Sequence, residues 1–165
     1  MDERNARIAT KTSGSDWRTI IGNTSVPLDT VTLWSIKALS RMWDGIYVGV
    51  VPSDIDRNTC NYDKCGWYFN CYGSTLWSGP PHDYNWKEYE PMKEKREYVH
   101  TGDSVGVMID TENGNFSFAL DGANLGVAYE RISLSYLASF FIEAVILWSS
   151  WFETEESVLF FHLIL

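Results

Sequence analysis

Two runs of alternating apolar and polar residues, 104–110 and 115–120, are separated by only four residues. Alternation of this kind is typical of a β-strand that buries one face. The connecting residues end in Asn113-Gly114, a pair that favours a hairpin turn because both residues tolerate positive φ. A second turn, at Asp121-Gly122, leads into another strand-like run. These features predict three successive antiparallel strands, so any fold for this chain must accommodate an antiparallel sheet.

The same short period runs through most of the chain. Strand-like runs are parted by Gly, Pro and Ser turns, and no convincing helical period occurs before residue 132. About a dozen short strands at this spacing predict an all-β fold, an antiparallel β-sandwich of two sheets forming one domain over residues 1–165. In the run 31–39, Val31, Leu33 and Lys37 are expected on one face and Trp34 and Ile36 on the other. The further strands are expected at 8–12, 17–21, 46–51, 66–72, 75–78, 125–129, 144–148 and 157–161, with a polar loop at 53–65 and an exposed loop at 82–97.

The charge and cysteine content argue against some classes of protein. The formal net charge is -9 and no dense basic run occurs, which makes the chain a poor candidate for binding nucleic acid. Three cysteines, Cys60, Cys65 and Cys71, are too few and too irregular for a disulfide framework, and the opening residues are polar and do not resemble a secretory signal. We therefore expect a reducing compartment, the cytoplasm.

One apolar stretch, 132–152, is long enough to span a membrane as a helix. Glu143 lies at its centre, where an acidic residue costs about 2.5–3.5 kcal/mol on insertion. The interpretation we favour is a buried segment followed by the core strand 144–148. A membrane-tethered form is the alternative.

Three groups of residues resemble the SPRY (B30.2-like) family. The first is Ile46-Tyr47-Val48-Gly49-Val50, and the second is Gly66-Trp67-Tyr68 followed by Leu76-Trp77. The third and longest runs from Thr101-Gly102-Asp103-Ser104-Val105-Gly106 through Asp121-Gly122 to Leu125-Gly126-Val127-Ala128-Tyr129, with Asp121 where the family often has Asn. The core of the resemblance covers residues 46–129, whereas the apolar tail, 132–165, departs from the family pattern.

The resemblance implies a concanavalin-like jelly-roll sandwich and a non-catalytic protein–protein interaction module, such as an adaptor. Its protein or peptide partner would bind through loops at one edge of the sandwich, among them the loop 22–27. The expected partner-binding residues are Asn23, Thr24, Ser25, Trp77, Pro80, Pro81, Tyr84 and Trp148. Exposed aromatic rings also stack on sugars, so a lectin-like glycan-binding sandwich remains the alternative.

No constellation typical of an enzyme is present in the sequence. His82, His100 and His162 occur in unrelated contexts, and His100 is expected in a loop or at a strand edge. The cysteine spacings do not match a zinc site, and Cys71 is expected to be a small buried hydrophobic residue. We therefore expect no catalytic residues, no metal and no cofactor, and nothing in the sequence points to a small-molecule substrate.

Overall fold

The structure is a computed structural model of the chain. It describes residues 6–11, 18–39, 46–52, 66–78, 85–93, 98–132, 142–148 and 157–164. The elements are β1 (Ala6–Lys11), β2 (Arg18–Val26), β3 (Val31–Ala38), β4 (Ile46–Pro52), β5 (Trp67–Asn70), β6 (Thr75–Ser78), β7 (Asn85–Glu88), α1 (Glu90–Lys93), β8 (Ser104–Asp110), β9 (Asn115–Leu120), β10 (Ala123–Tyr129), β11 (Ile142–Trp148) and β12 (Ser157–Ile164).

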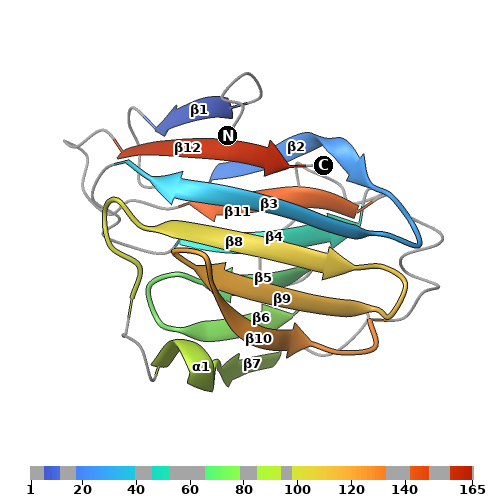
Figure 1. Cartoon of the computed structure of the whole chain (residues 1–165). Coiled ribbons are helices and arrows are strands. Elements are labelled where there is room, and N and C mark those ends of the chain that lie inside the picture. The colour runs from blue at the N-terminus through green and yellow to red at the C-terminus, as the bar shows by residue number, and fades with distance from the viewer. Residues whose placement is uncertain are drawn as a thin grey trace.

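The strands form two six-stranded antiparallel sheets that pack face to face. We call the sheet β1-β12-β3-β8-β9-β10 sheet A and the sheet β2-β11-β4-β5-β6-β7 sheet B. In Figure 1, sheet A lies in front of sheet B, and α1 lies beside β7 at one edge of the sandwich. The predicted all-β antiparallel sandwich of two sheets is therefore confirmed.

Alternation along the strands sends one set of side chains from each sheet into a common core. In β3, Trp34 and Ile36 are buried while Val31, Leu33 and Lys37 are exposed, as the sequence predicts. The largest fully buried side chains come from both sheets and from α1: Tyr68, Phe69, Leu76, Met92, Phe116 and Phe118. The rings of Phe69 and Phe118, one from each sheet, lie 5.2 Å apart between centroids and join the two layers.

The two central hairpins close by different means. Between β8 and β9, the Asp110 carboxylate accepts hydrogen bonds from the backbone and side-chain N–H groups of Asn113, and Gly114 adopts a φ of 68°. These bonds lower the pKa of Asp110. Between β9 and β10, both loop residues have positive φ, 49° at Asp121 and 79° at Gly122, as the tightest hairpin turn requires. The hairpins that Asn113-Gly114 and Asp121-Gly122 predict are thus present.

Two of the predicted loops are wrong in part. The segment 82–97 contains β7 and the single helical turn α1, with Tyr89 and Met92 buried in the core. Residues three apart share one face of a helical turn, but a turn this short has no period that a sequence pattern could reveal. The expected loop 22–27 is also wrong, because β2 continues to Val26 by pairing with β11 through a bulge.

The apolar stretch that raised the membrane question contributes a strand to the middle of sheet B. Strand β11 pairs with β2 on one side and with β4 on the other, which confirms the predicted strand at 144–148. Among the residues that the structure describes, no helix is long and apolar enough to cross a membrane. The preceding residues, 133–141, lie outside the described part of the chain.

Side chains from the β7 edge of sheet B close the sandwich against β10, the edge strand of sheet A. The Tyr89 hydroxyl donates to the carbonyl oxygen of Gly126 (2.7 Å), and the Lys87 ammonium donates to that of Ala128 (2.9 Å). In the other direction, the Tyr129 hydroxyl of β10 reaches the carbonyl oxygens of β5 and β6. The bonds to Gly126 and Ala128 use backbone carbonyls that the open edge strand β10 would otherwise offer to another chain.

Candidate partner-binding surface

Trp77 is the predicted binding residue that the structure describes most fully. It lies in β6, where its neighbour Leu76 points into the core and Trp77 itself is half-buried on the outer face of sheet B. The indole ring meets Tyr47 edge to face, with 5.5 Å between centroids, and its N–H donates to the Thr75 hydroxyl (2.7 Å). The ring is therefore held in one orientation while part of it stays accessible.

The other predicted residues that the structure describes lie on β2 and β11, and β4 and β5 separate these strands from Trp77 in β6. Asn23, Thr24 and Ser25 lie in β2, where Ser25 pairs with Glu143 near the start of β11. Trp148 ends the same strand and pairs with the core residue Ile46. Five residues of extended chain separate these two positions by about 17 Å. The predicted positions Pro80, Pro81 and Tyr84 lie outside the described residues, so their role in binding stays a prediction.

A cluster of three exposed rings lies at the Ile46 end of sheet B. Tyr72 is 54% exposed and Tyr98 is 43% exposed, and their rings are stacked with 6.2 Å between centroids. The exposed imidazole of His100 lies next to Tyr98, with 4.6 Å between the two ring centroids. We call Tyr72, Tyr98 and His100 the aromatic rim.

The rim stands on backbone that is tied to both sheets. The Val99 N–H donates to the Cys71 carbonyl (2.9 Å), and the Cys71 N–H donates to that of Ile46 in sheet B (2.8 Å). On the other side, Ala38 of sheet A donates to the Asp103 carbonyl (3.0 Å) and accepts a bond from Gly102 (2.7 Å). The segment 98–103 therefore bridges the two layers, and its exposed rings are presented on a fixed frame.

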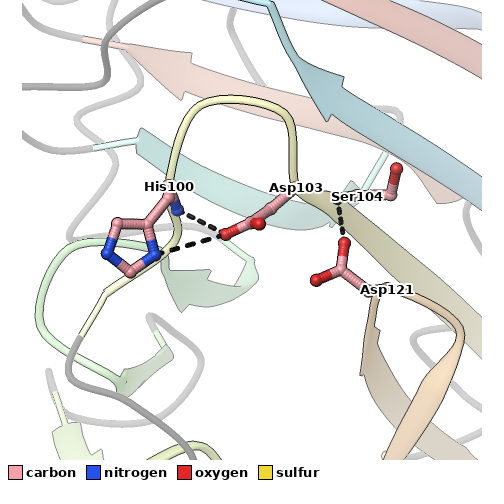
Figure 2. Close-up of polar contacts among 4 residues, drawn as sticks. All are labelled: His100, Asp103, Ser104 and Asp121. Atoms are coloured by element: carbon pink, nitrogen blue, oxygen red, sulfur yellow. Dashed lines mark hydrogen bonds and ion pairs between the residues drawn. The ribbon is translucent and has the colours of Figure 1, made fainter.

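Two carboxylates hold the turns beside the rim (Figure 2). Asp103 Oδ2 accepts a hydrogen bond from the His100 N–H (2.5 Å) and lies 3.6 Å from His100 Nδ1. Asp121 Oδ1 accepts a bond from the Ser104 N–H (2.8 Å), which fixes the start of β8 to the β9–β10 turn. These acids satisfy backbone donors of turns, an arrangement that stabilises local structure.

A pair of polar residues connects the aromatic rim with Trp77. The Asn70 side chain accepts a hydrogen bond from the Tyr72 N–H (3.0 Å), and Asn70 pairs in register with Thr75. Thr75 in turn accepts the hydrogen bond from the Trp77 ring. The surface at this end thus combines rings with hydrogen-bonding groups, the composition found at the centres of protein interfaces.

Sequence reasoning missed Tyr72 and Tyr98 and placed His100 only as a loop or strand-edge residue. Tyr72 was expected within the strand 66–72, but β5 ends at Asn70 and Tyr72 lies in the turn that follows it. Tyr98 lies in the segment before β8, where no alternation indicates which side chains are exposed. A usable signal was the density of aromatic residues at strand ends, since large rings outside a strand pattern are candidates for recognition. Cys71, beside Tyr72, is a buried free thiol whose burial raises its pKa, which confirms the prediction for that residue.

Comparison with known proteins identifies the fold and the family. The SPRY domain family model matches residues 31–150, most of the chain, so the chain belongs to the SPRY domain family. SPRY domains generally serve as protein-interaction modules. No curated protein matches the sequence.

Solved structures show the same architecture at low sequence identity. The chain is similar to the crystal structure of the SPRY domain of human HERC1, with 15% identity, a TM-score of 0.70, and coverage of 99% of this chain and 97% of that one. It is also similar to the crystal structure of a human SPRY domain, with 11% identity, a TM-score of 0.59, and coverage of 93% and 96% respectively. Identity at this level supports the shared fold alone.

Proposed function

We propose that this chain is a non-catalytic interaction module that binds a peptide segment or a folded protein through the end of the sandwich that carries the aromatic rim and Trp77. The observation that carries the proposal is the aromatic rim itself. Two stacked tyrosines, Tyr72 and Tyr98, are about half exposed although their backbone is anchored to both sheets. Exposed rings on a rigid frame lose little conformational entropy when a partner covers them.

The chemistry of the surface suits recognition of a protein. Tyrosine and tryptophan bury large areas and still offer a hydrogen-bonding group, and they are enriched among the residues that dominate binding energy. The half-buried Trp77 and the polar pair Asn70 and Thr75 extend this surface along sheet B. The positions Asn23, Thr24, Ser25, Pro80, Pro81, Tyr84 and Trp148 remain proposed contacts of the same partner or of a second one.

An adaptor role in the cytoplasm completes the proposal. It is supported by the acidic composition, which disfavours nucleic acid, and by the free thiol of Cys71, which is compatible with a reducing compartment.

A binding screen with matched variants tests the proposal. The wild type and the double variant Tyr72→Ala, Tyr98→Ala are compared on a random peptide array, with Trp77→Ala as a second test and Val127→Ala as the control. Val127 is 48% exposed on the outer face of sheet A, so its truncation removes comparable exposed apolar surface elsewhere. Loss of about 1–2 kcal/mol per ring predicts at least tenfold weaker binding by the double variant and unchanged binding by the control.

Two results would contradict this assignment. Equal binding by the wild type and both ring variants would remove the aromatic rim and Trp77 from the binding surface. Binding to a glycan array that the ring variants abolish, with no peptide bound, would replace the protein-interaction role with the lectin-like alternative. Circular dichroism of each variant confirms that the sandwich is intact.

A further inference from the structure

The outer face of sheet A, turned to the viewer in Figure 1, carries large apolar side chains that the sandwich core does not use. Among the described elements, no helix or strand lies in front of this face. Val31 and Leu33 of β3 are 54% and 46% exposed, and Val127 of β10 is 48% exposed. Single apolar residues are ordinary on a protein surface, but several on one sheet face indicate a surface that another molecule can cover.

These apolar side chains follow the pairing between the strands. Leu33 pairs in register with Met108, Met108 pairs with Ser117, and Ser117 pairs with Val127. Residues directly opposite each other on neighbouring strands lie on the same face of a sheet. Four strands therefore contribute to one continuous row, which we call the apolar row: Leu33, Met108, Ser117 and Val127.

The next row along the same strands consists of small side chains. Ser35 pairs in register with Gly106, and Gly106 pairs with Ala119. We call Ser35, Gly106 and Ala119 the small row, and it lies two residues, about 7 Å, from the apolar row. Two sheet faces pack well when large side chains of one lie over small side chains of the other. This face offers both kinds of row side by side.

One charge of each sign lies on this face, at opposite ends of its strands. Lys37 is exposed near the end of β3, whereas Asp110 ends β8 and pairs in register with Val31 at the start of β3. Within the described part of the chain neither Lys37 nor Asp110 has an ion pair, and the Asp110 carboxylate is bonded by the neutral N–H groups of Asn113. Because the two rows between them are uncharged, the face is close to neutral on a chain with a formal net charge of -9.

From these observations we infer that a second copy of this chain packs on the outer face of sheet A, as a homodimer whose two-fold axis runs across the strands between the apolar row and the small row. Rotation about this axis reverses the strand direction, so the apolar row of each copy lies over the small row of the other. The same rotation places Lys37 of each copy over Val31 and beside Asp110 of the other. Interfaces about a two-fold axis are self-complementary in this way.

The charge and the size of the face set the strength that we expect. Two copies of an acidic chain repel each other, and a nearly neutral face is where they meet at the lowest cost. Six strands about 4.8 Å apart and about 20 Å of strand length give a plane of roughly 24 Å by 20 Å. This plane is smaller than the roughly 800 Å² that each partner buries in a standard interface, so we expect a weak dimer, with a Kd of about 10–100 μM.

Sedimentation equilibrium of the full chain tests the inference. Between about 1 and 500 μM, the wild type should change from monomer to dimer. Leu33→Glu places a charge in the centre of the interface and should weaken dimerisation at least about tenfold. Leu39→Glu is the matched control, because Leu39 is 42% exposed just after β3 and lies beyond the positions that the partner's β3 covers. If Leu33→Glu does not fold, Val127→Glu in the same row takes its place.

Two substitutions of Val31 test the orientation of the copies. Because Lys37 of the partner lies over Val31, Val31→Glu should strengthen the dimer about two- to fivefold, and Val31→Lys should weaken it by a similar factor. The net charge alone predicts the opposite order, since Val31→Glu makes each copy more negative and Val31→Lys makes it less so. The two variants therefore separate the proposed contact from general repulsion.

The outcomes distinguish this inference from the proposed function, which it goes beyond and does not need. A wild type that stays monomeric throughout the titration, or equal dimerisation by Leu33→Glu and Leu39→Glu, would overturn the homodimer. The opposite order of the two Val31 variants would overturn it as well. Trp77 lies on the outer face of sheet B, so loss of peptide binding by Trp77→Ala in a monomeric chain would leave the proposed function standing without the dimer.

Discussion

The Tyr129 hydroxyl is a cross-sheet tie whose contribution can be measured. Tyr129 ends β10 in sheet A, and its hydroxyl lies 2.8 Å from the carbonyl oxygens of both Tyr68 and Trp77 in sheet B. Burial is the main reason that the pKa of this hydroxyl is raised, so it remains a protonated donor at neutral pH. The substitution Tyr129→Phe removes this donor and retains the ring, which stacks on Phe116.

The expected loss of stability follows from this geometry. One buried hydrogen bond contributes about 0.5–1.5 kcal/mol net, and a buried acceptor that loses its donor adds to the cost. We therefore expect Tyr129→Phe to lower the free energy of unfolding by about 1–2 kcal/mol. Tyr89→Phe, which breaks the bond from the Tyr89 hydroxyl to Gly126 of the same strand, should cost a similar amount.

Urea denaturation followed by tryptophan fluorescence measures the effect. With a slope of about 2 kcal/mol per molar urea, Tyr129→Phe should move the midpoint down by about 0.5–1 M and leave the slope unchanged. Tyr72→Phe, at an exposed ring, is the control and should stay within about 0.5 kcal/mol of the wild type. A Tyr129→Phe midpoint indistinguishable from the wild type would refute the claim that this bond stabilises the closed edge.

Three further measurements test other parts of the structure. Burial raises the pKa of the Tyr89 hydroxyl to about 12. As pH rises above about 10, the unfolded chain loses this proton before the folded chain does, so the free energy of unfolding should fall. Urea titrations at several pH values should show a shallower fall for Tyr89→Phe. Gly49→Ala would place a Cβ against the backbone of β5, so it should cost over about 3 kcal/mol of stability or prevent folding. Gly106→Ala should cost under about 1 kcal/mol. Equal melting temperatures of the two variants would contradict this difference. Asp121→Asn should preserve the melting temperature, because Asn tolerates positive φ and keeps the acceptor, while Asp121→Ala should lower stability by about 1–2 kcal/mol.

Strands were predictable wherever one face of the strand is buried and the other is exposed to solvent. The runs that became β8 and β9 have the bounds that their alternation predicts, because each alternate residue, such as Val105, Val107 and Ile109, enters the core. The glycines in the turns were equally readable, since Gly114 and Gly122 adopt the positive φ that their hairpins require.

Elements that depend on distant partners were not predictable. Strand β2 runs through Gly22 to Val26 because β11, more than a hundred residues later, supplies its hydrogen bonds. Two strand glycines have different surroundings. A Cβ added at Gly106 would first meet the Ala119 side chain, whereas one added at Gly49 would meet the Trp67 carbonyl oxygen of the neighbouring strand. Which of two glycines faces a backbone depends on strand register, and local sequence does not encode it.

The candidate site was predictable in kind and only in part by residue. Trp77 was identified through the family resemblance, and its partial exposure fits a role in binding. The aromatic rim was missed because it brings together the β5–β6 turn and the segment 98–103, which meet through the Val99–Cys71 hydrogen bond and the stacked rings of Tyr72 and Tyr98. A pattern along the chain cannot reveal neighbours that meet through such a contact.

Under the proposed function, the bonds by which residues 98–103 join the two sheets are distinct from the rings that would contact a partner. The anchoring bonds of this segment run largely through the main chain, from Val99 to Cys71 and from Ala38 to Gly102 and Asp103. The rings of Tyr72 and Tyr98 project from that main chain and contribute little to its anchoring. New specificities could therefore arise, or be selected from a library at these positions, while the stability of the sandwich stays nearly constant.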